Sequence, residues 1–153
     1  MIAVIQRVSK STVHIDDALV SQINSGLNVL LCVTHDDIEE DVYYLADKIV
    51  RLRIFSDQED KMNLSLLEIG KELMVISQFT LAADTRRGNR PSFTNAARPD
   101  KGEELYNLFV DYIQKKYSIN VQKGVFGAKM TINIINEGPV TIIIDSSKNK
   151  RKQ

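Results

Sequence analysis

Apolar and polar positions alternate along the first third of the chain, and a spacing of two residues is typical of β-strands. Three runs rich in β-branched residues are separated by short polar breaks: Ala3 to Val8, Ser11 to Ile15 and Leu19 to Ile23. The turn cluster Asn24-Ser25-Gly26 then leads into the apolar run Leu27 to Val33. The pattern therefore predicts an N-terminal third made of strands.

Helical spacing replaces this alternation after Asp36. Apolar residues recur at intervals of three or four, at Ile38, Val42, Leu45, Ile49 and Leu52. This spacing predicts an amphipathic helix that ends near Leu52, with Asp36 as its N-cap and Glu39 placed to close a capping box. The same spacing predicts a second amphipathic helix around Leu105, Leu108, Phe109, Tyr112 and Ile113.

The remaining segments are shorter. Ile54-Phe55 should begin a strand before the polar loop Ser56 to Asn63, and Ala82 to Asp100 is polar and irregular. Four further apolar runs are predicted to be strands: Glu72 to Ser77, Asn120 to Lys123, Met130 to Ile135 and Val140 to Asp145. The last two are apolar at nearly every position, which predicts burial of both faces, one of them by a second subunit.

Many short strands with two main amphipathic helices predict a single α+β domain with a curved, barrel-like mixed sheet. The chain of 153 residues is of ordinary size for one domain with its own core. We expect the domain to span residues 1–146 and residues 147–153 to be a basic, flexible tail. Fraying is expected from Ser146 onward.

Composition narrows the class of protein. Hydrophobic residues make up 43% and charged residues 26%, and the formal net charge is zero, so any nucleic-acid contact must come from local patches. No apolar run approaches the ~20 residues of a membrane-spanning helix, and the first residues lack the pattern of a signal peptide. Cys32 is the one cysteine and lies in an apolar run, which predicts a buried small hydrophobe. We expect a cytoplasmic protein without a membrane partner.

Candidate catalytic side chains are few. The two histidines, His14 and His35, are far apart in the sequence, and no zinc-like spacing, nucleophile elbow or nucleotide fingerprint occurs, so neither metal nor cofactor is expected. Ser77 and Thr80 are hydroxyl candidates after an apolar strand. A hydroxyl nucleophile needs a neighbouring base. Without one, Thr80 is expected to be a structural residue.

Two short segments resemble the sequence motifs of a known protein family. Ser77-Gln78-Phe79-Thr80-Leu81 follows the apolar strand, and Asn136-Glu137-Gly138-Pro139-Val140-Thr141 lies between the last two apolar runs. Together they resemble the signature pair of the D-aminoacyl-tRNA deacylases, long called D-tyrosyl-tRNA deacylases. Other stretches that match this family are Ile5 to Val8, Lys61 to Ser65, Ala83 to Gly88, Arg90 to Phe93 and Phe126 to Met130. Cys32, where glycine is usual, and Glu137, where aspartate is usual, are departures that leave Gly138-Pro139 intact.

The resemblance implies hydrolysis of the ester between a D-amino acid and the terminal ribose of tRNA, and removal of glycine from mischarged tRNA. It implies that Ser77, Gln78, Phe79 and Thr80 form one wall of the catalytic pocket. Gly138 and Pro139, joined by a cis peptide, would come from the partner subunit of a homodimer. With Met130 they would bind the substrate and select its chirality.

Steric exclusion of L side chains explains how such a pocket could select a D-amino acid. A rigid backbone wall would collide with an L side chain and leave room for a D side chain or for glycine. The family is thought to use a hydroxyl of the RNA to activate water, which fits the shortage of catalytic side chains. Positive charge follows the first motif in the sequence, and Arg86, Arg87 and Arg90 are the expected contacts for tRNA phosphates.

Two alternatives remain open on the sequence. A noncatalytic nucleic-acid-binding module on the same fold would bind RNA or DNA without turnover. An esterase acting through Thr80 would cleave a substrate that lacks the RNA 2′-hydroxyl.

Overall fold

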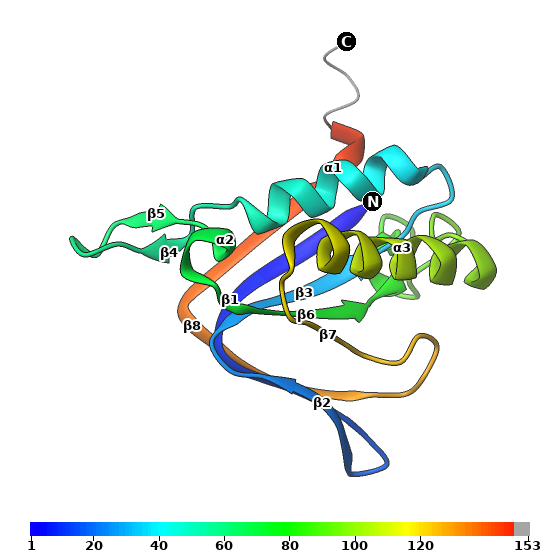
Figure 1. Cartoon of the computed structure of the whole chain (residues 1–153). Helices are drawn as coiled ribbons and strands as arrows, with labels where there is room; N and C mark the ends of the chain where they lie inside the picture. Colours follow the sequence, from blue (N-terminus) through cyan, green and yellow to red (C-terminus); the bar gives the residue numbers. More distant parts are fainter. Residues whose placement is uncertain (149–153) are drawn as a thin grey trace.

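A computed structural model describes residues 1–148 and shows a mixed sheet that bends until it is nearly closed (Figure 1). Its six strands are β1 (Ile2–Ile15), β2 (Ala18–Ile23), β3 (Gly26–Cys32), β6 (Glu72–Ser77), β7 (Val121–Lys123) and β8 (Thr131–Asp145). Hydrogen bonds connect them in the order β2-β1-β3-β6-β7, and β8 pairs with β1. The predicted fold class is therefore confirmed.

Strand β1 pairs with three other strands of the sheet. Its first half pairs with β3 and its second half with β2, while β8 runs antiparallel to it from Ile2↔Asp145 to His14↔Thr131. β3, β6 and β7 are parallel neighbours. The Ser21 Oγ of β2 donates to the Lys123 O of β7 at 2.8 Å, which brings the two ends of the sheet together.

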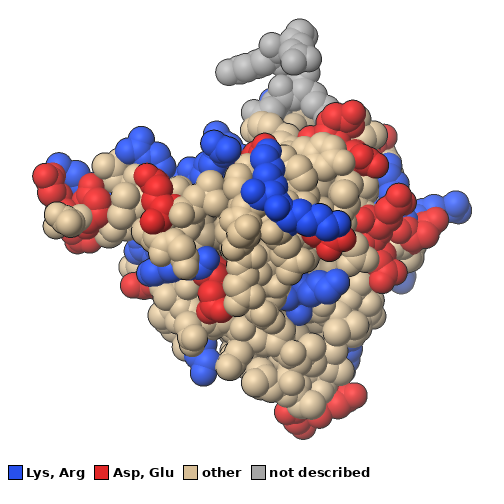
Figure 2. All heavy atoms as spheres, viewed as in Figure 1, with Lys and Arg blue, Asp and Glu red and all other residues tan. Residues whose placement is uncertain are grey.

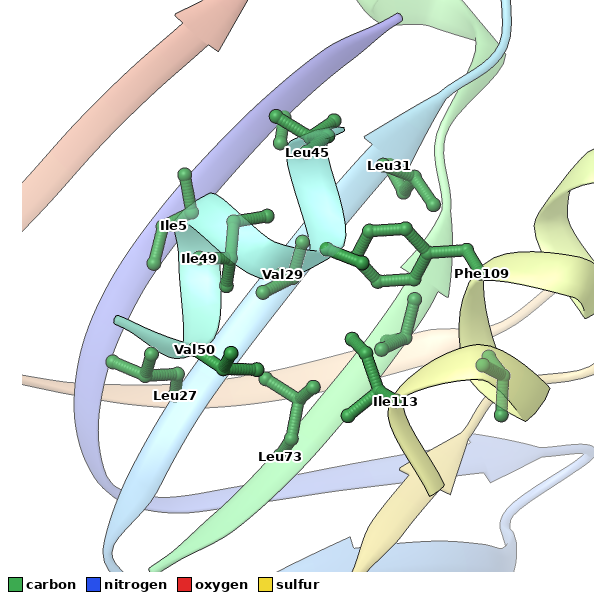
Figure 3. Packing of buried hydrophobic residues seen from close by; sticks show 14 of the residues in the cluster. Ile5, Leu27, Val29, Leu31, Leu45, Ile49, Val50, Leu73, Phe109 and Ile113 are labelled. Carbon is green, nitrogen blue, oxygen red and sulfur yellow. The ribbon is translucent and has the colours of Figure 1, made fainter. Parts of the chain in front are cut away.

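Two long helices, α1 (Glu39–Val50) and α3 (Pro99–Tyr117), cover one face of the sheet. They run in parallel, because Lys101 Nζ donates to His35 O at one end and Tyr117 OH donates to Asp47 Oδ1 at the other. Figure 3 shows Leu45 and Ile49 of α1 packed with Phe109 and Ile113 of α3 over apolar strand residues. Both predicted helices are confirmed.

The predicted start of the first helix is wrong. Its N-cap is Ile38, whose backbone N–H donates to Asp41 Oδ2 at 3.0 Å, so Asp41 rather than Glu39 closes the first turn. Asp36 is exposed and pairs with His35 instead. Asp37, between Asp36 and the N-cap Ile38, is buried and forms an ion pair with the Met1 amino group. This tertiary contact of Asp37 explains why the helix begins after Ile38 and not after Asp36, the N-cap that local propensity favours.

Alternation along β6 divides the interior into two cores. Leu73 and Val75 belong to the core under the helices, whereas Met74 and Ile76 belong to a smaller core inside the curve of the sheet. A strand that is buried on both faces reads as one continuous apolar run. Its predicted bounds, Glu72 to Ser77, are confirmed.

Short elements fill the connections, and the predicted loop after Ile54 is partly a hairpin. The short elements are β4 (Phe55–Ser56), β5 (Met62–Leu64), α2 (Leu66–Ile69) and the 3₁₀ turns η1 (Phe79–Ala82) and η2 (Ser146–Lys148). The β4–β5 hairpin projects from the body of the molecule (Figure 1). Among the described residues, no helix is long and apolar enough to cross a membrane.

Strand β8 is one strand where two were predicted, and one of its faces is open. Ile135 is 55% exposed and Ile143 is 70% exposed. The single chain therefore leaves this face open, and its burial by a second subunit stays a prediction. A long strand edge with exposed isoleucines is a surface that favours pairing with another chain.

The two ends of the described chain meet. The Met1 amino group is buried, forms an ion pair with Asp37 and donates to Ser146 Oγ at 2.8 Å. Ser146, predicted to belong to a frayed tail, is instead buried, and Ser147 Oγ donates to Asp145 Oδ1 at 2.8 Å. The rest of the predicted flexible tail, residues 149–153, lies outside the described residues.

Candidate active site

A cavity of about 370 Å³ opens at the C-terminal end of β6, where the first motif begins. Ser77 ends the strand, and Gln78 continues its pairing by donating its N–H to Leu31 O at 2.8 Å. The chain then turns into η1. Ligands commonly bind beyond the carboxyl ends of parallel strands. The parallel pair β3–β6 therefore places the motif at a favourable position for a binding site.

Three of the four predicted wall residues line this cavity: Ser77, Gln78 and Phe79. Thr80 does not line it and is exposed. Its Oγ1 accepts a hydrogen bond from Gln78 Nε2 at 2.6 Å. In the described part of the chain, neither histidine lines the cavity and no group of three or more metal-ligating side chains comes together.

Two backbone donors next to the cavity are unused. η1 begins at Phe79, so the N–H groups of Phe79 and Thr80 have no carbonyl of a preceding turn to bond. Among the described residues no other acceptor reaches either of them. Such groups are available to stabilise negative charge on a bound molecule.

Aromatic rings make up much of the remaining cavity lining, and the sequence did not predict them as site residues. Phe93 packs edge-on against Phe79 with ring centroids 5.2 Å apart. Tyr106 of α3 lies 5.8 Å from Phe126 and donates its hydroxyl to Val75 O at 2.8 Å. Burial raises the pKa of the Tyr106 phenol far above its usual value, so it remains a donor. Phe93 stands out as an apolar residue in a polar loop, whereas Tyr106 resembles any core residue of a helix.

Met130 lies beside this lining rather than in it. Its sulfur accepts the Val125 N–H at 3.3 Å, and a side chain at Gly124 would come within 2.7 Å of the same sulfur. Met130 therefore supports the turn that carries Phe126 and Gly127, which do line the cavity. Met130 does not line the cavity of its own chain.

The second motif forms a bulge on β8. Gln6 and Val8 of β1 pair with Thr141 and Asn136, so Arg7 alone lies opposite residues 137–140. Proline cannot donate to a strand ladder, which explains why the ladder opens here. Asn136 closes the base of the bulge by donating to Thr141 Oγ1 at 2.9 Å.

Gly138 and Pro139 protrude at the tip of this bulge and are exposed. Their peptide bond is cis, as predicted, and Gly138 has a φ of 124°. Arg7 holds the bulge from below, because its Nε donates to Glu137 O at 3.3 Å and its Nη1 to Ile54 O at 2.9 Å. Neither Gly138 nor Pro139 lines the cavity of its own chain.

The predicted arginines lie in the loop between η1 and α3. Asp84 and Ser92 bridge the base of this loop, and Arg86 forms a bidentate ion pair with Asp84, with Nη2 2.6 Å from Oδ2. The Arg86 side chain holds the pKa of the Asp84 carboxyl well below its usual range. Arg87 and Arg90 are exposed and have no ion pair among the described residues.

The chain is similar to known proteins over nearly its whole length. The model of the D-Tyr-tRNA(Tyr) deacylase family matches residues 4–145. A D-aminoacyl-tRNA deacylase of Clostridioides difficile (strain 630) is 55% identical over 148 residues, covering 97% of this chain and 99% of the relative. One from Petrotoga mobilis is 52% identical with the same coverage.

Two solved structures share the fold. The c-Myc DNA unwinding element binding protein superposes with a TM-score of 0.91 at 35% identity, over 95% of this chain and 98% of that one. A probable eukaryotic D-amino acid tRNA deacylase superposes with a TM-score of 0.81 at 17% identity, over 94% and 97% of the two chains.

Proposed function

The chain belongs to the D-Tyr-tRNA(Tyr) deacylase family, a family of hydrolases, and on that premise we propose that it hydrolyses D-aminoacyl-tRNA to free tRNA and D-amino acid. The observation that carries the proposal is the cavity with two unused backbone donors, Phe79 N–H and Thr80 N–H, at its edge. An aminoacyl ester is already activated, so positioning and stabilisation of the oxyanion account for much of the required catalysis.

The apolar lining of the cavity suits the terminal adenosine of the tRNA. Nucleobases bind proteins by stacking on aromatic side chains, and Phe79, Phe93 and Phe126 supply such rings. With the base held there, the ester of the same nucleoside would lie near the first turn of η1. The RNA hydroxyl next to the ester would then activate water, which explains why the protein needs no general base of its own.

Chiral selection is proposed to come from the bulge of a second subunit. The tip residues Gly138 and Pro139 are exposed, and the adjoining face of β8 carries Ile135 and Ile143 for a dimer interface. A backbone wall facing the substrate α-carbon would exclude an L side chain but accept a D side chain or glycine. Activity on mischarged glycyl-tRNA follows from the same geometry.

The tRNA phosphates would contact Arg86, Arg87 and Arg90. The protein would act in the cytoplasm.

A deacylation assay with D-aminoacyl-, L-aminoacyl- and glycyl-tRNA tests the proposal. The D-aminoacyl and glycyl esters should be cleaved and the L-aminoacyl ester spared. Binding of all three without cleavage of any would favour the noncatalytic nucleic-acid-binding module. Equal cleavage of D and L esters would contradict selection by the bulge, and cleavage of a 2′-deoxy substrate would favour the esterase alternative.

A further inference from the structure

A group of exposed cations lies where α1 ends and the β4–β5 hairpin begins. Lys48, Arg51 and Arg53, which we call the basic shoulder, border a hollow of about 530 Å³ together with Tyr44, Asp47 and Leu52. In Figure 2, Lys and Arg side chains follow one another from the base of the hairpin toward the C-terminal end of α3. This is a local concentration of positive charge on a chain whose formal net charge is zero.

The positive charge of the shoulder is largely unneutralised. Asp47, its one carboxylate, accepts from Lys116 Nζ at 3.0 Å and from Tyr117 OH at 2.6 Å. Lys48 has neither a hydrogen bond nor an ion pair among the described residues. Favourable interaction with the C-terminal end of α1 accounts for Lys48 and Arg51, but Arg53 lies beyond the helix.

Arg7 ties the shoulder to the bulge. One guanidinium group donates to Ile54 O, directly after Arg53, and to Glu137 O, directly before Gly138. A single side chain therefore contacts both the start of the bulge and the residue that follows Arg53. Wherever the bulge is inserted, the adjoining basic shoulder accompanies it.

We propose that the subunit that inserts Gly138 and Pro139 into its partner's cavity also supplies the basic shoulder to the RNA bound there. The inference rests on the proposed function and extends it to the body of the substrate. The ligand of the cavity is the end of a polyanion, so phosphates must lie just outside the opening that the bulge narrows. Cations at that position attract phosphates irrespective of sequence, and Tyr44 adds a ring on which a base or sugar can pack.

Mixed dimers of two differently tagged copies test which subunit supplies the charge. One copy, the pocket owner, carries Gly138→Ala, so the only working cavity is its own, served by the intact bulge of the other copy, the bulge donor. Lys48→Ala with Arg51→Ala is then placed on either copy.

On the bulge donor the two substitutions should lower kcat/KM for D-aminoacyl-tRNA several-fold. The salt dependence of kcat/KM should become shallower by roughly one unit of slope for each phosphate that is no longer neutralised. On the pocket owner the two substitutions change only the shoulder beside the inactive cavity, so kcat/KM should stay unchanged.

Four controls separate binding from folding. Thermal unfolding of each dimer is measured, and Lys48→Ala alone is included because this side chain makes no hydrogen bond or ion pair in the described structure. Lys61→Ala, on the hairpin tip and paired with Glu59, removes one charge as Lys48→Ala does and should retain full activity. A D-aminoacyl-adenosine substrate carries no further phosphates, so the reduction in kcat/KM should vanish with it.

Equal reductions from both placements, or an unchanged salt slope, would overturn the inference while leaving the deacylase function intact. Failure of the parent mixed dimer to cleave either substrate would overturn the proposed function itself, and the inference with it.

Discussion

At the scale of single residues, the chemistry of the candidate site is backbone chemistry. The side chains around the cavity offer hydroxyls, an amide and aromatic rings, and the unused polar groups are the amides of η1. Cys32 fits the same picture, since burial raises the pKa of its thiol to about 11 and leaves it a neutral neighbour of the motif.

Thr80→Ala should retain substantial deacylase activity. Thr80 Oγ1 accepts a hydrogen bond from the Gln78 amide and has no base beside it in the described structure, so it has no means of becoming a nucleophile. Single-turnover rates of the variant and the parent protein provide the measurement. An acyl group trapped on Thr80 and detected by mass spectrometry during turnover would contradict this expectation.

Gly138→Ala should abolish most deacylation. A Cβ there would lie 2.9 Å from Val140 Cγ2, 3.0 Å from Val140 N and 3.1 Å from Arg7 Nη2, at a φ of 124° that L side chains rarely adopt. The tip of the bulge must therefore shift. Gly70→Ala is the matched control, with a φ of 60° and no atom within 4 Å. It should cost about 1 kcal/mol of stability and leave the rate unchanged. Equal rates for the two variants would show that the tip of the bulge is not part of the site.

At the scale of elements, turns and loops determine where the strands present their residues. Strand β1 reaches β2 through Asp16 and Asp17, which have φ values of 48° and 64°. Two consecutive residues with positive φ form the turn that matches the twist of a two-residue hairpin, a turn that Asn-Gly favours.

Asp17→Gly should stabilise this hairpin. Glycine adopts a positive φ without the penalty of about 1–2 kcal/mol that other residues incur, although it loses about 0.5–1 kcal/mol in chain entropy. A net gain of up to about 1 kcal/mol in the free energy of unfolding is expected from urea denaturation. Asp17→Ala keeps the penalty and should show no gain, so equal stabilities of the two variants would contradict the argument.

The arginine loop should contribute charge unequally. Arg87→Ala should weaken tRNA binding and reduce the salt slope by roughly one unit, because this side chain is exposed and unpaired among the described residues. Arg86→Ala should have a smaller effect on the slope, since Asp84 already neutralises Arg86. Binding titrations over a range of salt concentrations measure both, and unchanged slopes would leave the loop as a solvated surface.

At the scale of the whole molecule, one chain does not bring the cavity and the bulge together. The bulge faces solvent, and no residue of β8 lines the cavity of the same chain. A symmetric dimer would give each cavity the bulge of the other chain, because a two-fold contact uses the same surface twice.

Ile143→Lys should therefore convert dimer to monomer and lower deacylation with it. Ile143 is 70% exposed on β8, and a charge in a dimer interface would be desolvated without a partner. Sedimentation velocity and activity measured on the same samples check this, with the exposed Met62→Lys on the β4–β5 hairpin as a control that should stay dimeric. A monomeric parent protein with full activity would refute a site that two subunits share.

The amino-acid sequence by itself determined the elements whose pattern of burial is regular. The two long helices follow from the spacing of apolar residues, which reports the face of a helix that leaves water, and β6 follows from an unbroken apolar run, which reports burial of both faces. The two motifs and the lone buried Cys32 also came from the sequence, the motifs through their resemblance to a family.

Only the tertiary structure decided which segments meet. Ser146 is ordered because it bonds to the other end of the chain, and the first helix begins late because the buried Asp37 pairs with Met1. Tyr106 enters the site because α3 packs on β6, where the Tyr106 hydroxyl donates to Val75 O. Arg7 faces the bulge because the β1–β8 register slips there. Periodicity describes one element against water, whereas a site depends on contacts between elements distant in sequence, which the packing of the whole chain fixes.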